Sequence, residues 1–288
     1  MNASTEPIKP ETVIKAKSNW SAVNLSELLE YRDMLRYLVI RDFISKYKQT
    51  ILGPAWFIIQ PLLMGVIFTV IFGKVAGLST DGTPQFLFYL CGQLGWTYFQ
   101  TCLSATAGNL ISNANLFKKV YFPRVIVPLA TMTSNLLAFA IQLLSFLGFW
   151  LYFKFGTDQG ARFEMQAIVL ALPLVVLQTA AISMSIGLWL SAMSAKYRDL
   201  HHLTPFFVQS FMYITPIIYP LSQVPEKFQW LIKLNPLTAI VETYRHMLLG
   251  TPAVASADLI VSIVITGLLL ISGLIIYDKT QRNFIDYA

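Results

Sequence analysis

The chain has 288 residues, of which 55% are hydrophobic and 12% are charged, and its mean hydropathy is +0.58. Soluble domains carry about 25% charged residues, so the composition argues against a soluble protein and indicates an integral membrane protein. The formal net charge of +6 is spread between apolar segments rather than gathered in one basic domain. Nucleic-acid binding is therefore not expected.

The first 50 residues precede the first long apolar segment. Residues 1–23 are polar and contain two prolines, which predicts a flexible cytoplasmic tail. From Asn24 leucines recur at helical spacing, and Asn24 and Glu27 are spaced like a capping box. Residues 24–50 are therefore predicted to form an amphipathic interface helix and a connector at the cytoplasmic membrane surface. This pattern fits both a plain lipid anchor and a surface for a partner protein.

Six segments are long and apolar enough to cross a hydrocarbon core about 30 Å thick, which takes about 20 residues. We place them near residues 51–73, 85–107, 125–153, 167–195, 203–220 and 257–277. The expected fold class is an all-α integral membrane protein with six transmembrane helices in one domain, residues 51–278. Residues 279–288 are expected to be a cytoplasmic C-terminus.

Residues 221–251 are more apolar than an ordinary loop, but prolines and charges interrupt them. They predict a re-entrant outer hairpin of two short amphipathic helices, whose charges stay near the headgroups. The lipid-facing groups of this hairpin would be Phe228, Trp230, Leu231 and Leu234.

With the N-terminus inside, all but six of the 21 Lys and Arg residues lie in cytoplasmic segments. The positive-inside rule therefore predicts that both termini are cytoplasmic. The first 50 residues contain no apolar core followed by a small-residue cleavage site, so no removable signal peptide is expected. Cys91 and Cys102 lack metal-ligand spacing and are expected to be buried free thiols.

Sequence signatures of catalysis are missing. The chain has no phosphate-binding loop, no nucleophile elbow, no H-x-x-x-H pair and no pair of carboxylates within a span. The adjacent His201 and His202 would point in different directions on a helix and have no third ligand nearby. We expect no catalytic residue, no metal site and no ATP site in this chain.

Aromatic residues make up 14% of the chain, and many lie within the spans. Sugar rings stack on aromatic rings, while sugar hydroxyls need amide and hydroxyl partners. The first, second and fifth spans mix both kinds of side chain, which indicates a carbohydrate path, although any single ring could instead pack against lipid or a neighbouring helix. The candidate channel-lining residues are Trp56, Phe57, Gln60, Phe68, Phe88, Tyr89, Gln93, Trp96, Phe99, Phe207, Phe211 and Tyr213.

Basic residues gather on the expected inner side. Because Arg and Lys suit phosphate oxygens, some of them are candidates for binding the diphosphate of a lipid carrier, although topology signalling alone would also explain them. These candidates are Arg36, Arg41, Lys46, Lys48 and Arg124.

Several short motifs follow one another between residues 24 and 278. They are Gly53-Pro54-Ala55-Trp56, Gln60-Pro61, the run from residue 115 to 124, Tyr197-Arg198-Asp199-Leu200, the run from 215 to 220, Leu234-Asn235-Pro236 and Tyr244-Arg245. In these motifs the chain resembles the polysaccharide-exporting transmembrane subunits of type 2 ABC exporters, which move O-antigen, capsule or teichoic acid chains.

The resemblance implies a homodimer in a bacterial inner membrane that passes a lipid-linked polysaccharide, most simply O-antigen, along the dimer interface. It also implies two copies of a separate cytoplasmic ABC subunit that hold ATP and Mg, with no cofactor in this chain. The residues implied to contact that subunit are Glu27, Glu30, Asn115, Phe117, Lys118, Lys119, Arg198 and Asp199.

Three other functions also fit the sequence. A drug or small-lipid exporter subunit would share the architecture, because fold does not fix cargo. A membrane glycosyl or acyl transferase would use His201, His202 or Asp199 at the inner face. The third is a membrane scaffold without a transport role.

Overall fold

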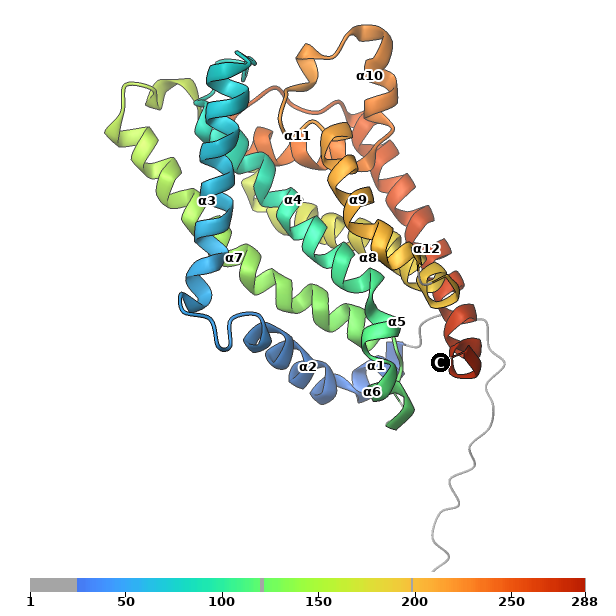
Figure 1. Ribbon diagram of the computed structural model, residues 1–288. Helices are drawn as coiled ribbons and strands as arrows, with labels where there is room; N and C mark the ends of the chain where they lie inside the picture. Colours follow the sequence, from blue (N-terminus) through green and yellow to red (C-terminus); the bar gives the residue numbers. More distant parts are fainter. Residues whose placement is uncertain (1–24, 120–121, 198, 288) are drawn as a thin grey trace, which may run out of the picture.

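The computed structural model describes residues 25–119, 122–197 and 199–287. All regular elements within these residues are helical (Figure 1), which satisfies the backbone polar groups of each segment internally. The expected all-α class is thereby confirmed. The α-helices are α1 (Leu25–Glu30), α2 (Arg32–Ser45), α3 (Trp56–Phe68), α4 (Gln85–Ala107), α5 (Asn109–Ser112), α6 (Ala114–Lys119), α7 (Ile126–Gly156), α8 (Leu172–Lys196), α9 (Asp199–Ile214), α10 (Glu226–Lys233), α11 (Pro236–Leu249) and α12 (Ser256–Tyr287). Helical elements of other geometry are η1 (Gly53–Ala55), η2 (Thr69–Val75), η3 (Gly160–Arg162), η4 (Ala167–Ala171) and η5 (Leu221–Gln223).

Four helical stretches are long and apolar enough to cross a membrane: Gly53–Val75, Ile126–Gly156, Ala167–Lys196 and Ser256–Gln281. They match the first, third, fourth and sixth predicted spans to within a few residues. The other two predicted spans are not confirmed. α4 has 23 residues, but its Gln, Thr and Tyr side chains lower its hydropathy. α9 has only 16 residues, whereas a crossing takes about 20.

The predicted interface helix is interrupted and forms two helices. α1 and α2 are separated at Tyr31, and α2 packs along α7. Leu38 is buried in the protein, whereas Tyr37 and Ile40 on the same helix are exposed. α2 therefore buries part of its apolar surface against the bundle and leaves another part free for lipid or protein.

α8 lies at the centre of the bundle and packs along both α4 and α12. Small residues permit this close approach, as they do at other helix interfaces in membranes. A Cβ placed on Gly187 of α8 would lie 2.6 Å from Thr106 Cβ on α4. One placed on Gly273 of α12 would lie 2.9 Å from the carbonyl oxygen of Ser185. The two glycines thus set the separation of the three helices.

Gly187→Ala should destabilise the bundle by about 1–3 kcal/mol, the usual cost of overpacking a tight core. The added Cβ would meet a branched side chain at its own Cβ, which cannot rotate away. Gly267→Ala on α12 is the matched control, because a Cβ there meets nothing within 4 Å; it should be neutral or slightly stabilising. Melting temperatures in detergent measure both effects, and equal temperatures for the two variants would contradict this packing.

The fifth predicted span, residues 203–220, extends too far at its C-terminal end. α9 stops at Ile214, and residues 215–220 turn back instead of continuing the helix. Thr215 Oγ1 accepts a hydrogen bond from Asn235 Nδ2 at 3.0 Å. The Asn235 side chain also caps α11 by accepting from Leu237 N at 3.0 Å. The apolar residues after α9 therefore belong to a buried turn that is fastened to the start of α11.

α10 and α11 form the helical hairpin predicted for residues 221–251. Its four expected lipid-facing groups are exposed, namely Phe228, Trp230, Leu231 and Leu234. α11 differs from α10, because most of its residues are buried in the protein against α4, α8 and α12. Arg245, which was expected near the headgroups, is completely buried. The depth of the hairpin in a membrane stays a prediction.

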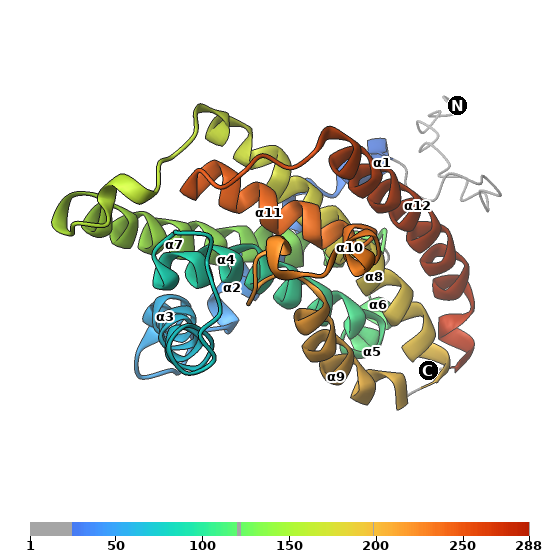
Figure 2. The ribbon, with the colours of Figure 1, turned by 90° about the horizontal axis from the view of Figure 1, so that it is seen from above.

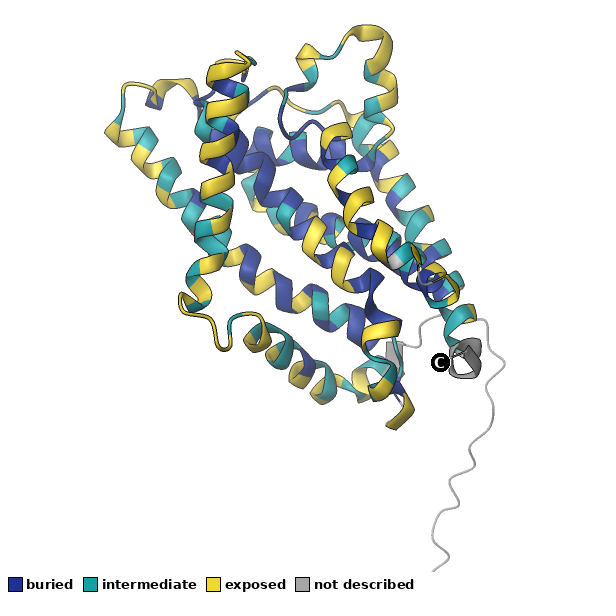
Figure 3. Ribbon diagram, in the orientation of Figure 1, coloured by how far each residue is buried: buried dark blue, intermediate teal, exposed yellow. Residues whose placement is uncertain are grey.

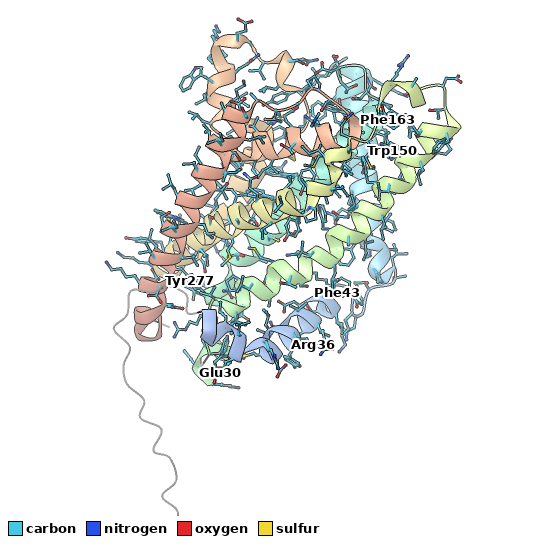
Figure 4. The ribbon with its side chains drawn as sticks, turned by 180° about the vertical axis from the view of Figure 1, so that it is seen from behind. Glu30, Arg36, Phe43, Trp150, Phe163 and Tyr277 are labelled. Carbon is cyan, nitrogen blue, oxygen red and sulfur yellow. The ribbon has the colours of Figure 1, made fainter. Side chains whose placement is uncertain are left out.

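The two ends of the bundle differ. Glu30 and Arg36 lie at one end, together with α6 and the last turns of α12 (Figures 1 and 4); we call it the near end. Trp150 and Phe163 lie at the opposite, far end, which also carries α10 (Figures 1 and 4). Trp150 Nε1 donates to the carbonyl of Leu248 at 2.9 Å and its ring meets Phe163 edge-on at 5.6 Å. The loop after α7 is thereby held against α11.

The C-terminal segment predicted to begin at residue 279 continues the last helix. α12 continues as a helix to Tyr287. Tyr277 is buried, and its hydroxyl accepts a hydrogen bond from Asn109 Nδ2 at 3.0 Å. This bond fastens α12 to α5 at the near end.

Candidate functional site

One side of the bundle carries rings, amides and hydroxyls. α3 and α9 lie on this side and flank α4 (Figure 2). α3 and α9 contribute many exposed residues, whereas α4 is largely buried and exposes residues only in its second half (Figure 3). The exposed aromatic and polar residues that we call the mixed face are Trp56, Gln60, Gln100, Thr101, Ser104, Phe206, Phe207, Gln209 and Tyr213.

Aliphatic residues are also exposed on α3, and they dominate the middle of α12. The outward residues of α12 include Ile263, Leu268 and Ile271, all at least half exposed, as expected of a helix that faces acyl chains. Polar side chains are costly against hydrocarbon, which offers them no hydrogen-bond partner. The mixed face is therefore suited to meet water, a polar ligand or another protein.

The predicted channel-lining residues on α3 and α9 are mostly accessible. Trp56, Phe207 and Tyr213 are 47%, 43% and 55% exposed, and Gln60 is exposed as well. Phe57 and Phe211 are half-buried, and Phe211 stacks on Phe207 with a centroid distance of 5.7 Å. These positions could contact a ligand on this side without any rearrangement.

The predicted residues of the second span lie inside the protomer. Five candidates of the second span are each at most 6% exposed, namely Phe88, Tyr89, Gln93, Trp96 and Phe99. Phe68 of the first span is equally buried. Phe99 packs against Phe211 at 6.1 Å, and Tyr89 against Phe68 at 6.2 Å. They form part of the core, and lining a path would require them to leave this packing. Near-helical spacing could not reveal this, because it does not identify which neighbour covers each face.

The near end carries the residues predicted to contact an ATP-binding subunit. Short helices α5 and α6 lie there, between α4 and α7 in the chain (Figure 1). Arg198 and the side chain of Glu27 lie outside the described residues. The exposed members of the set are Glu30, Asn115, Lys118, Lys119 and Asp199.

Phe117 is the buried member of that set. Its ring packs against Phe122 at 5.6 Å, and the Arg124 guanidinium lies 5.4 Å from its centroid. Arg124 Nη1 also donates to the carbonyl of Gln281 near the end of α12. We call α6 and residues 122–124 the elbow, and Phe117 packs inside it. Arg124, predicted as a diphosphate ligand, joins the elbow to α12 in this conformation.

The other basic candidates also differ in their surroundings. Arg41 is paired with Asp42, with 2.7 Å between Nη2 and Oδ1. Arg36 and Lys48 are exposed. Lys46 is exposed as well, but its ammonium group is hydrogen-bonded to Asn135. Arg36 and Lys48 are therefore the candidates most accessible to a phosphate group from outside the protein.

Lys46 turns toward the bundle. Its ammonium group donates to Asn135 Oδ1 on α7, and Asn135 Nδ2 reaches Cys102 Sγ on α4 at 3.4 Å. The connector after α2 is therefore linked through α7 to α4. Cys102 and Cys91 are both free and buried, as the sequence predicts.

Lys46→Met should lower the stability of the protein by about 1 kcal/mol, since a single partly exposed hydrogen bond to a charged group is lost. Lys48→Met, two residues away on the exposed side of the connector, should have no measurable effect. Melting temperatures in detergent and protease cleavage within residues 46–50 compare the two variants. If both variants melt and are cleaved like the wild type, Lys46 does not anchor the connector.

An unpredicted ion pair lies within the far half of the bundle. Arg245 Nη1 donates to Glu242 Oε1 at 2.8 Å, and Nη2 donates to the carbonyl of Ile217 at 2.7 Å. The guanidinium carbon lies 3.7 Å from the centroid of the Phe88 ring. Burial raises the pKa of Glu242, and the nearby Arg245 charge partly offsets this rise. The available sequence signal was the opposite charges spaced i, i+3 within an apolar run.

The described residues contain no group of three His, Cys, Asp or Glu side chains that could hold a metal ion. Asp199 and His202, the residues considered for a membrane transferase, are exposed at the start of α9. The side chain of His201 lies outside the described residues. Exposed positions of this kind lack the water-excluded surroundings in which acid–base catalysis is most effective.

The sequence is similar to known proteins over most of the elements described above. Residues 34–249 match the family model described as ABC-2 type transporter. The chain is 27% identical over 253 residues to the O-antigen export system permease protein RfbA of Klebsiella pneumoniae, covering 88% of this chain and 93% of that protein. It is 25% identical over 260 residues to RfbA of Myxococcus xanthus, covering 90% and 96%. It is 23% identical over 217 residues to the polysialic acid transport protein KpsM of Escherichia coli, covering 73% and 78%.

The matched range extends from α2 to α11 and includes the mixed face, the elbow and the buried ion pair. The resemblance inferred from the short motifs is thus confirmed, and the chain belongs to the ABC-2 type transporter family.

Proposed function

We propose that this chain is the permease subunit of an ATP-driven exporter that moves a lipid-linked polysaccharide, O-antigen, across the inner membrane of a bacterium. The names of the relatives, O-antigen export permeases and a polysialic acid transport protein, support a polysaccharide cargo. The similarity extends over 88% or more of this chain for the two O-antigen permeases, which supports O-antigen as the cargo.

The mixed face is the structural observation that carries this proposal. Its amides and hydroxyls would be poorly satisfied against lipid, whereas aromatic rings beside amides suit sugar units. A second copy of the chain packed against this side would enclose the face in a homodimer. Trp56, Gln60, Phe207 and Tyr213 would then line the path between the subunits. A drug exporter would not require this mixture of rings and amides.

ATP hydrolysis belongs, in this proposal, to two copies of a separate cytoplasmic subunit that bind ATP and Mg. The chain itself contains no phosphate-binding loop. The near end, with α1 and the last turns of α12 (Figure 1), would face the cytoplasm, so both termini lie on that side. Lys118 and Lys119 on α6 would meet the ATP-binding subunit. Arg36 and Lys48 would attract the diphosphate of the lipid carrier.

Deleting this chain and restoring it from a plasmid tests the proposal. We expect deletion to remove O-antigen from the cell surface while lipid-linked polysaccharide of full length accumulates inside, and the plasmid to reverse both effects. Polysaccharide extracted from surface and interior is compared on gels. Unchanged surface polysaccharide would refute the function. Internal polysaccharide with missing or altered sugars would instead favour a transferase.

A further inference from the structure

A cavity of about 270 Å³ lies at the far end, within one protomer and apart from the mixed face. Its wall combines the loop before α4, the segment between α9 and α10, α11 and the loop before α12. Leu221, Pro252 and Val254 supply apolar surface, and Thr251 and Glu242 supply polar groups. Pro252 is among its exposed lining residues, so the cavity reaches the protein surface.

Thr251 provides the first indication of a ligand. Its residue is 9% exposed, and its hydroxyl is buried without any hydrogen-bond partner in the protein. A buried hydroxyl without a partner is unfavourable, and a valine of the same shape would avoid the cost. The carbonyl of the same residue, in contrast, is hydrogen-bonded to His246 Nδ1 at 2.5 Å. The unpaired hydroxyl therefore suggests a partner from outside the chain.

Asp81 provides the second indication of a ligand. It lies on the cavity wall and is exposed. Ser222 Oγ donates to Asp81 Oδ1 at 3.0 Å and to Oδ2 at 2.9 Å. The carboxylate is thereby held in place by η5. Because a carboxylate can accept further hydrogen bonds, Asp81 is a fixed acceptor at the edge of the cavity.

The charges on the wall restrict the kind of ligand. Asp258 is paired with Lys233 at 3.0 Å, and Glu242 is paired with the buried Arg245. Asp81 remains as the carboxylate without a cationic partner among the described residues, so an acidic ligand would be repelled. A metal ion is disfavoured as well, since the described residues place no three acidic, His or Cys side chains together.

We propose that this cavity binds one neutral sugar unit of the exported polysaccharide. The sugar hydroxyls would donate to Asp81 and Glu242, and the C–H face would lie on the apolar wall. The Thr251 hydroxyl is covered in this conformation, and its side chain would turn toward the cavity to bond another sugar hydroxyl. Small-molecule sites usually measure about 300–1,000 Å³, so this volume suits a single unit rather than a chain. The inference rests on the proposed function and adds to it a site, outside the path between subunits, that holds the chain as it emerges.

The test compares two threonine-to-valine variants of the full chain in lipid nanodiscs. Thr251→Val removes the unpaired hydroxyl of the cavity. Thr243→Val on α11 is the matched control. The Thr243 hydroxyl already donates to the carbonyl of Ala239 at 2.6 Å, and Thr243 does not line the cavity. Saturation-transfer NMR measures binding of the methyl glycosides of glucose, galactose and mannose, with glucuronate as the acidic probe.

We expect at least one neutral glycoside to bind the wild type and the control, and Thr251→Val to weaken this binding about fivefold or more, the effect of one lost hydrogen bond. Glucuronate should not bind. Melting temperatures should show that Thr251→Val folds as well as the wild type, because it removes an unsatisfied group. No binding of any neutral glycoside to the wild type, or equal binding to both variants, would overturn the assignment.

The deletion experiment separates this inference from the function on which it rests. If deletion stops export but the wild type binds no neutral glycoside, the function stands and the sugar site is wrong. If deletion leaves surface polysaccharide unchanged, the proposed function fails, and the assignment of the cavity to an exported sugar fails with it.

Discussion

Replacing Arg245 with methionine should destabilise the folded protein by about 3–5 kcal/mol, because it leaves the Glu242 carboxylate buried without its positive partner. It also removes the donor to the Ile217 carbonyl and the cation over the Phe88 ring. α11 would then lose its polar link to the turn after α9. Size-exclusion chromatography after stepwise heating in detergent should show aggregation at lower temperatures than for the wild type.

The pH dependence distinguishes the missing charge from lost packing. Burial raises the pKa of Glu242, and removing Arg245 would remove the charge that opposes this rise. A carboxyl group with a higher pKa in the folded than in the unfolded protein binds more protons when folded. The stability of Arg245→Met should therefore increase as the pH falls from about 8 to about 5, and more than that of the wild type.

The double variant Arg245→Met with Glu242→Leu is the corresponding control. Removing both members of a buried ion pair is often much less harmful than removing one, so the double variant should regain much of the lost stability. If it is no more stable than Arg245→Met and neither responds to pH, the site depends on the shape of the arginine rather than on its charge.

Reversing the charges of Lys118 and Lys119 to glutamate should lower surface polysaccharide about tenfold or more while leaving insertion and folding of the chain intact. Both lysines are exposed on α6, so their replacement disturbs no core contact. An ATP-binding subunit complementary to these lysines would meet like charges instead, and such juxtapositions cost several kcal/mol. Co-purification of the two subunits and surface polysaccharide are the two measurements.

Arg162→Glu with Lys227→Glu makes the same change of charge at exposed positions of the far end. This control should keep both the complex and export, because its residues face away from the proposed ATP-binding subunit. Normal co-purification and export in the Lys118 and Lys119 variant would show that the elbow does not bind the ATP-binding subunit through these lysines.

Residues 53–75, 126–156, 167–196 and 256–281 could be predicted as membrane helices because continuous apolar stretches of this length have few alternatives. Hydropathy was a poorer guide at residues 203–220, where an apolar turn and an apolar helix have the same composition. It also could not show that Arg245 is buried within the protein. The Arg245 guanidinium is held by Glu242 nearby in the chain and by Ile217 and Phe88, which come from distant parts of the chain.

The structure gives a physical reason why some of the sequence motifs occur together. Asn235 of one motif bonds to Thr215 of another, and Arg245 of a third bonds to Ile217. These separate stretches thus form a single polar joint between α9 and α11. Sequence order alone could identify the motifs as a set, but it could not show that they meet in space or that Phe117 and Arg124 pack within the elbow.

The bond between Arg124 and the Gln281 carbonyl has a practical consequence for observing this protein at work. Since it ties the elbow to the last turns of α12, a fluorescent dye near the C-terminus should follow displacements of the elbow without altering Lys118 or Lys119. Paired with a second dye on the exposed surface of α10, it would report whether the distance between the two ends of one protomer changes when the proposed ATP-binding subunit turns over nucleotide.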